Sequence, residues 1–161
     1  MSPLFLVETK PMFKCLHSVS SLLPHAPPMV LLDDIVGKEE REASALVTIH
    51  ANSVFFLEGK GVPSYVGLEY MAQTCGVFAG LERIESGGPI QLGYLLGTRN
   101  FHAFVGWFKA GEKLIINVRE TFRQGTMGVF DCLIRSADKD LASAQLKLYH
   151  PEEVALVDRS F

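Results

Sequence analysis

Apolar and small side chains fill nearly every position of residues 63–83 (PSYVGLEYMAQTCGVFAGLER). At the helical period of 3.6 residues they cover most of the circumference, which predicts one long buried helix over this range. One stripe of that helix carries, at spacings i, i+4, i+7 and i+11, Glu69, Gln73, Gly76 and Gly80. A glycine weakens a helix interior by about 1 kcal/mol relative to alanine, so we expect another backbone to approach closely here.

Strand patterns lie on both sides of this helix. Hydrophobic or alternating runs predict strands over 29–36, 43–50, 91–106, 112–123, 127–136 and 141–149. The four later runs are joined by hairpin-like turns, and the breaker SGGP at 86–89 separates them from the helix. The order of two strands, one buried helix and four meandering antiparallel strands predicts an α+β fold in which a curved sheet wraps the helix.

Composition narrows the class of protein. The 161 residues are 48% hydrophobic, so we expect a single domain over 1–161, with residues 1–20 a possible arm or short helix. Neither a membrane-spanning run nor a signal peptide is evident, and three widely spaced cysteines indicate buried thiols in a reducing compartment. We therefore expect a cytoplasmic location. A net charge of −3 argues against nucleic-acid binding.

Three segments together resemble one known family. They are LLPHAPPMVLLDDIV at 22–36, VPSYVGLEYMAQTCG at 62–76 and FVGWFKAGEKLIINV at 104–118. They resemble, in the same order, the opening segment, central helix and strand–turn–strand of the hot-dog fold 3-hydroxyacyl-acyl carrier protein dehydratases. The chain is most similar to the divergent dehydratase-like branch of aryl polyene biosynthesis. The resemblance implies a hot-dog homodimer, joined sheet edge to sheet edge, with two active sites at the interface.

One position departs from the family. Its catalytic histidine belongs to a GHFP segment before the helix, and an ungapped count back from Glu69 places Phe55 there. The sequence has no histidine between His50 and Glu69. The usual pairing of that histidine with the helix glutamate is therefore absent.

Glu69 and His25 are the candidate catalytic residues. A glutamate in so apolar a helix is uncommon unless it has a function, although it could also reach solvent or pair with Arg83. We expect Glu69 to protonate the leaving hydroxyl. His25 stands in the LPH motif, which the resemblance places along the acyl tunnel, and a neutral imidazole there could remove the α-proton. We expect it within about 3–8 Å of a Glu69, from either subunit.

Further residues are candidates for substrate binding. Gln73 either orients Glu69 or makes a helix–sheet hydrogen bond. Ser64 lies at the helix start, where free backbone N–H groups could polarise a thioester carbonyl, but it could equally be a cap or first-turn residue. Phe55 and Phe56 are expected in the core or the tunnel wall.

The remaining histidines carry weaker arguments. His50 is expected to face solvent at a strand end and His102 to pack on a strand, and both are alternatives if His25 is remote. His17 and His150 support no argument, and no pair has metal-site spacing.

The resulting hypothesis is dehydration of a 3-hydroxyacyl thioester, carried on acyl carrier protein, to a trans-2-enoyl thioester. This chemistry requires no metal or redox cofactor, because the substrate brings its own phosphopantetheine arm. Two alternatives share the fold. One is a thioesterase in which Glu69 activates water, and the other is an inactive hot-dog subunit that binds an active heteropartner.

Overall fold

The computed structural model describes residues 13–151 of the chain. The predicted N-terminal arm therefore lies mostly outside the described residues. The described residues contain one helical turn near this segment, α1 (Val19–Leu22), whose N-cap Ser18 accepts a hydrogen bond from the backbone N–H of Ser21.

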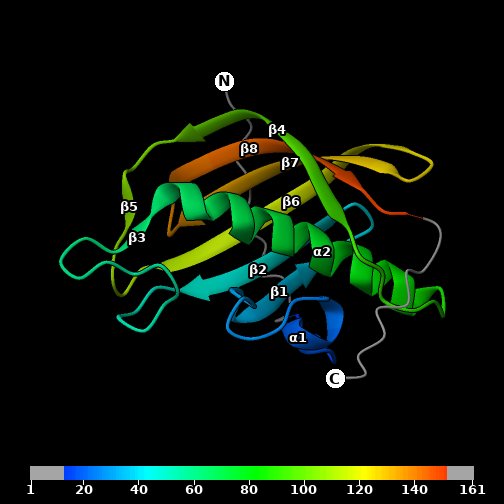
Figure 1. The fold of residues 1–161 in the computed structure, drawn as a ribbon, viewed down its shortest axis with the longest axis horizontal. Helices are drawn as coiled ribbons and strands as arrows, with labels where there is room; N and C mark the ends of the chain where they lie inside the picture. Colours follow the sequence, from blue (N-terminus) through cyan, green and yellow to red (C-terminus); the bar gives the residue numbers. More distant parts are fainter. Residues whose placement is uncertain (1–12, 152–161) are drawn as a thin grey trace.

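The central helix is confirmed. A 3₁₀ turn over Ser64–Val66 leads directly into α2, Gly67–Glu85. The helix lies across the concave side of the sheet (Figure 1), and Tyr70, Met71 and Phe78 are fully buried between the two. Burial on nearly all sides explains why polar positions are so sparse along this segment.

Six antiparallel strands form the main sheet in the order β1-β2-β6-β7-β8-β4. Their bounds are Asp34–Lys38 (β1), Glu42–Thr48 (β2), Tyr94–Ala103 (β4), Lys113–Gln124 (β6), Met127–Ser136 (β7) and Lys139–Tyr149 (β8). The sheet curls around α2 (Figure 1), as the sequence predicted. A second, two-stranded sheet pairs β3 (Val62–Pro63) with β5 (Trp107–Phe108) and was not anticipated.

Alternate side chains of the strands point toward α2 and form the core. In β2 every second residue is buried, and its Ala45 lies opposite Ile116 of β6. Side chains on one face of a strand recur every two residues, so Leu114, Ile116 and Val118 all face the core. The sheet face toward α2 is therefore apolar for most of its width.

Two expectations about strands were wrong. Residues 29–33 are not a strand, because β1 begins only at Asp34. The four later strands do not form one meander either, because β4 pairs with β8 at the far edge of the sheet. Nearly every residue of β4 is at least partly exposed on both faces. Such a strand cannot occupy the interior of the sheet, whereas β6, β7 and β8 each supply a buried apolar face.

The glycine stripe of α2 faces the N-terminal segment rather than the sheet. A Cβ added at Gly80 would lie 2.8 Å from the backbone oxygen of Leu22, and one at Gly76 would lie 2.9 Å from Leu23 Cδ2. The expected close approach of a backbone is thus present at Gly80. It lets residues 22–31 lie directly on the helix.

The cysteines follow the prediction in part. Cys75 of α2 and Cys132 of β7 are buried free thiols with 4.0 Å between their sulfur atoms, and Cys15 is half-buried. Burial raises the pKa of the Cys75 thiol, and the neighbouring Cys132 adds to the effect. Cys75 is therefore a packing residue with little thiolate character.

Candidate functional site

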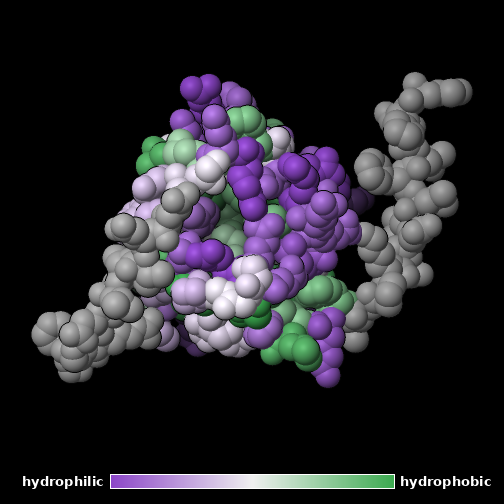
Figure 2. Space-filling view, turned by 90° about the vertical axis from the view of Figure 1, so that its right-hand side faces the viewer, coloured by the Kyte–Doolittle hydropathy of each residue, from purple (hydrophilic) through white to green (hydrophobic). Residues whose placement is uncertain are grey.

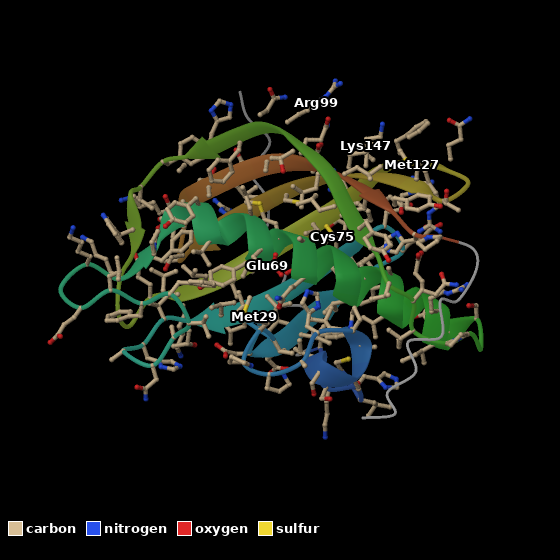
Figure 3. All side chains as sticks on the ribbon, in the orientation of Figure 1. Met29, Glu69, Cys75, Arg99, Met127 and Lys147 are labelled. Carbon is tan, nitrogen blue, oxygen red and sulfur yellow. The ribbon has the colours of Figure 1, made fainter. Side chains whose placement is uncertain are left out.

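The segment 24–31, here called the strap, crosses one face of α2 and makes a turn in which Met29 N donates to Ala26 O. Gln73 fixes it there: its Nε2 donates to the backbone oxygen of Met29 at 2.7 Å, and its Oε1 accepts from the N–H of Leu31 at 2.9 Å. Figure 3 shows Met29 next to the turn of α2 that carries Glu69. Since Gln73 is only 1% exposed, water cannot hydrogen-bond its side-chain amide, and the backbone of the strap supplies the partners instead.

Gln73 also holds the carboxylate one turn before it. The same Nε2 donates to Glu69 Oε1 at 2.9 Å, a spacing of i to i+4 on one helix face. The two interpretations of Gln73 were therefore not exclusive. The amide orients Glu69 and ties a backbone to the helix, although that backbone belongs to the strap and not to the sheet.

His25 meets the same carboxylate. Its Nε2 lies 3.4 Å from Glu69 Oε1 within one chain, so the expected proximity of the two residues is found without a second subunit. Their side chains are 34% and 38% exposed, which leaves both accessible from solvent. The Nδ1 atom of His25 is buried and has no hydrogen-bond partner among residues 13–151.

Glu69 is more accessible than its sequence context indicated. The helix is apolar around it, but the strap covers the carboxylate only in part. The alternative of an ion pair with Arg83 is not observed, and Oε1 is instead shared between the amide of Gln73 and the imidazole of His25. A half-open carboxyl next to an imidazole suits proton transfer to a bound molecule.

Tyr70 follows Glu69 but points into the core. It is 2% exposed and its ring stacks on Phe108, with 6.1 Å between centroids. Burial raises the pKa of Tyr70 to about 12, with a smaller contribution from the charge of Asp33. Its phenol therefore stays protonated at neutral pH.

Of the substrate-binding candidates, Gln73 alone among the described residues hydrogen-bonds Glu69. Ser64 is buried and opens the 3₁₀ turn, but it caps nothing with its side chain, and its N–H donates to Gly106 O at 3.0 Å. Phe56 packs partly against the core. Phe55 is 52% exposed, with φ at 66°, so it does not lie in the core, and its place in the tunnel wall stays a prediction. The rare positive φ turns its side chain outward from the loop.

Among the described residues, none of the other histidines forms an ion pair or a hydrogen bond with Glu69. His50 is exposed and its Nδ1 accepts from the N–H of Asn52 at 3.2 Å, as expected of a strand-end residue. His102 is exposed on β4 and stacks on Phe104, so it is not the packed residue anticipated. Over residues 13–151, no three His, Cys, Asp or Glu side chains form a potential metal site. In the same range no helix is long and apolar enough to cross a membrane.

Sequence reasoning missed a second polar cluster at the other end of α2. Glu120 is 6% exposed, although it continues the inward-facing row of β6. Arg123 donates to Glu120 Oε2 from Nε at 3.0 Å and from Nη2 at 2.8 Å, and Nη2 also reaches Glu82 at 2.5 Å. A charged residue in phase with Leu114, Ile116 and Val118 was the signal available in the sequence.

The fold and this site define a hot-dog protein of the dehydratase class. The model of the ApeP-like family, described as ApeP dehydratase, matches residues 17–158, and the chain belongs to that family. The resemblance to the aryl polyene branch is thereby confirmed, and the protein is an enzyme of the lyase type.

Curated relatives agree with this placement. The 3-hydroxyacyl-[acyl-carrier-protein] dehydratase FabZ of Pseudothermotoga lettingae is 38% identical over 135 residues, covering 81% of this chain and 92% of the relative. The FabZ of Streptococcus sanguinis is 28% identical over the same length, covering 81% and 94%.

Solved structures show the same architecture. The dehydratase heterocomplex ApeI:P from Xenorhabdus doucetiae contains a chain with a TM-score of 0.78 and 30% identity, covering 84% of this chain and 91% of that one. The PaaI protein of Escherichia coli, from the phenylacetic acid degradation operon, has a TM-score of 0.58 at 16% identity, covering 72% and 81%. The second likeness concerns the fold alone.

Proposed function

We propose that the protein dehydrates a 3-hydroxyacyl thioester, carried on acyl carrier protein, to the trans-2-enoyl thioester. The observation that carries this proposal is the 3.4 Å approach of His25 Nε2 to Glu69 Oε1, at a place where both side chains are accessible. Dehydration needs one group to remove the α-proton and another to protonate the departing hydroxyl. An imidazole and a carboxyl group supply both from adjacent positions.

His25 and Glu69 can carry out both proton transfers of the dehydration without another acid or base. In its reactive form the pair holds one proton, with His25 neutral and Glu69 protonated. His25 takes the proton from the α-carbon, the electron pair of that C–H bond forms the new double bond, and the β-hydroxyl leaves as water with the proton from Glu69. The pair then holds imidazolium and carboxylate, which attract each other at this distance.

Transfer of the proton from His25 back to Glu69 restores the starting form. No external acid or base is consumed, because one proton enters at the imidazole and one leaves at the carboxyl. In this scheme Gln73 is a positioning residue, since its amide holds Glu69 Oε1 and leaves Oε2 for the substrate hydroxyl. Among the described residues, no group hydrogen-bonds Oε2.

The thioester end is assigned to the start of α2. Backbone N–H groups at a helix N-terminus stabilise a developing oxyanion, which would help to acidify the α-carbon. Ser64 lies in the turn that enters α2, and Phe55 and Phe56 lie in the preceding loop. We assign these three residues to contacts with the acyl chain or the phosphopantetheine arm.

Edge pairing with another hot-dog chain is part of the proposal. β4 is the last strand of the sheet, and it exposes three successive large apolar side chains, Tyr94, Leu95 and Leu96. Such an edge suits a second strand from a like fold, in a homodimer or with a hot-dog heteropartner. The related structure from Xenorhabdus doucetiae is a dehydratase heterocomplex, ApeI:P, which supports the second possibility.

A catalytically inactive subunit is the second candidate function. The observation that favours it is Phe55, which stands at the position counted for the usual histidine and points into solvent. In that case the chain would complete or stabilise an active hot-dog partner, and the His25–Glu69 pair would have only a structural role.

The experiment is an assay of the purified chain with 3-hydroxyacyl and saturated acyl thioesters on acyl carrier protein, alone and with a hot-dog partner whose own catalytic residues are replaced. An enoyl product in either case supports the proposal. Free carrier thiol without enoyl product would indicate a thioesterase. Enoyl product only with an intact partner, unchanged by His25→Ala, would establish the inactive-subunit role.

A further inference from the structure

A cavity of about 350 Å³ opens at the end of the molecule where α2 and the β6–β7 hairpin end. Figure 2 shows it as a hollow with an apolar floor and a polar rim. Neither Glu69 nor His25 lines it, and Phe78, its first lining residue on α2, follows Glu69 by nine residues, or about 13 Å of helix. Figure 3 likewise places Met127, a wall residue, well to one side of Glu69. The cavity is therefore separate from the site described above.

Some of the charged side chains around the cavity form ion pairs with one another, and one does not. Arg123 forms ion pairs with both Glu120 and Glu82, and the hydrogen bonds that it donates to Glu120 are the main reason that its pKa is raised. Burial lowers the pKa of His150, and the nearby Arg123 acts in the same direction, so this imidazole is neutral at pH 7. These four groups together carry a net charge of about −1, and both carboxylates are bound to Arg123.

Arg83 is the cation that remains. It lines the cavity, and it forms no ion pair with any residue in the described part of the chain. Its Nε is buried and lacks a hydrogen-bond acceptor in the same part. A guanidinium binds carboxylates through strong, charge-assisted hydrogen bonds, and a half-buried one without a partner retains that capacity.

The floor favours a ligand with an apolar body. Phe78 and Phe130 are buried and meet edge to face, with 5.5 Å between their centroids, and Met127 adds an adaptable apolar wall. Gly128 keeps the space open, because a Cβ there would lie 3.1 Å from Phe130 Cε2. An apolar floor with a single polar anchor is the usual construction of a small-molecule pocket.

We propose that this cavity binds a small organic monocarboxylate, with its carboxylate on Arg83 and its apolar body on Phe78, Phe130 and Met127. A single unpaired cation matches one negative charge. The carboxylates of Glu82 and Glu120 also line the cavity and would repel a dianion such as phosphate. The site is independent of dehydration at Glu69.

The test is titration of the full chain with benzoate, benzamide and inorganic phosphate, followed by the NMR signals of the arginine Nε–H groups and of the backbone amides near Gly128. Benzoate is expected to shift both sets at about 10 mM, a concentration that detects dissociation constants near 1 mM. Benzamide, which has the same shape without the charge, and phosphate, which lacks the apolar body, are expected to bind at least about tenfold more weakly.

Variants locate the site. Arg83→Gln should weaken benzoate binding by about tenfold or more, whereas Arg119→Gln, on the outer face of β6, and Glu69→Gln should leave it unchanged. Gln is a good helix former, so we expect Arg83→Gln to fold, and the comparison of benzoate with benzamide on the unaltered chain does not depend on it. No benzoate shift, equal shifts with benzamide, or a response unaffected by Arg83→Gln would each overturn the proposal.

Discussion

The side-chain amide of Gln73 donates a hydrogen bond to the carboxylate of Glu69, with 2.9 Å between Nε2 and Oε1. The same nitrogen holds Met29 O, so the position of the candidate acid and the path of the strap depend on one side chain. The strap also carries His25. Gln73 therefore sets the distance between the two groups proposed to exchange protons.

Replacement of Glu69 by Gln tests the acid. Glu69→Gln keeps the shape of the side chain but removes its transferable proton, and loss of a positioned acid lowers the rate by about 10²–10⁴-fold. Steady-state dehydration of a 3-hydroxyacyl thioester measures the effect, and circular dichroism checks the fold. An unchanged rate in a folded variant would remove Glu69 from the mechanism.

Replacement of His25 tests the base through pH. An imidazole accepts the α-proton only when it is neutral, so the rate should fall toward acidic pH, and it should fall again at high pH as the pair loses its shared proton. His25→Ala is expected to abolish the acidic limb and lower the maximum rate. His50→Ala is the matched control, because His50 is exposed and forms no ion pair with Glu69. If His25→Ala keeps the acidic limb, another group is the base.

Removal of the amide tests positioning. Gln73→Met should leave Met29 O and Leu31 N without their partner, and because both groups are only part-buried we expect a total loss of about 1–3 kcal/mol in the free energy of unfolding. We also expect kcat to fall more than KM rises, and the Leu31 amide to exchange faster with solvent. Gln145→Met, on the outer face of the sheet, should change stability by less than about 0.5 kcal/mol. If the Leu31 amide exchanges as slowly in Gln73→Met as in the unaltered chain, Gln73 does not hold the strap on α2.

Two glycines of α2 give a matched pair. In Gly80→Ala the new Cβ would meet the backbone oxygen of Leu22, which cannot move without the strap, so we expect a loss of about 1–3 kcal/mol in stability. In Gly76→Ala it meets only the flexible end of Leu23, and the gain of about 1 kcal/mol in helix propensity should offset the contact. Chemical denaturation measures both. Equal stabilities would show that the approach at Gly80 is not tight.

His150 makes stability depend on pH. Burial lowers its pKa in the folded state, so the unfolded chain binds a proton first as the pH falls below about 6.5. The free energy of unfolding should therefore decrease below that pH and level off once the folded form is also protonated. His150→Gln should remove this part of the slope, and His17→Gln, at an exposed position, should retain it. Identical slopes in the two variants would exclude His150.

Much of the fold could be predicted because its signals are local. The apolar helix over 63–83 and the alternation in β2 and β6 depend on side-chain period alone, and they gave elements within a few residues of those observed. The place of β4 could not be predicted in this way. Whether a strand pairs with its neighbour in sequence or crosses to the far edge depends on long-range competition among strands, which no local pattern records.

The candidate site was predictable to a similar degree. Glu69, Gln73 and His25 were identified from an unusual polar stripe and a motif, and the structure brings all three together. Phe55 was misplaced because a positive φ in a loop turns the side chain outward, and a bulky residue gives no sign of it. Arg83 was considered only as a partner of Glu69. Its lack of an ion pair depends on which carboxylates Arg123 binds, and only the tertiary structure shows this.

The exposed edge at β4 also affects whether newly synthesised protein aggregates. On the side away from β8, this ten-residue strand presents unpaired backbone groups together with apolar side chains, and such an edge can pair with other strands without selectivity. A newly made copy is thus at risk of aggregation until a proper neighbour covers that edge. Yield of intact protein from a cell should consequently depend on whether a matching hot-dog chain is made at the same time and in comparable amount.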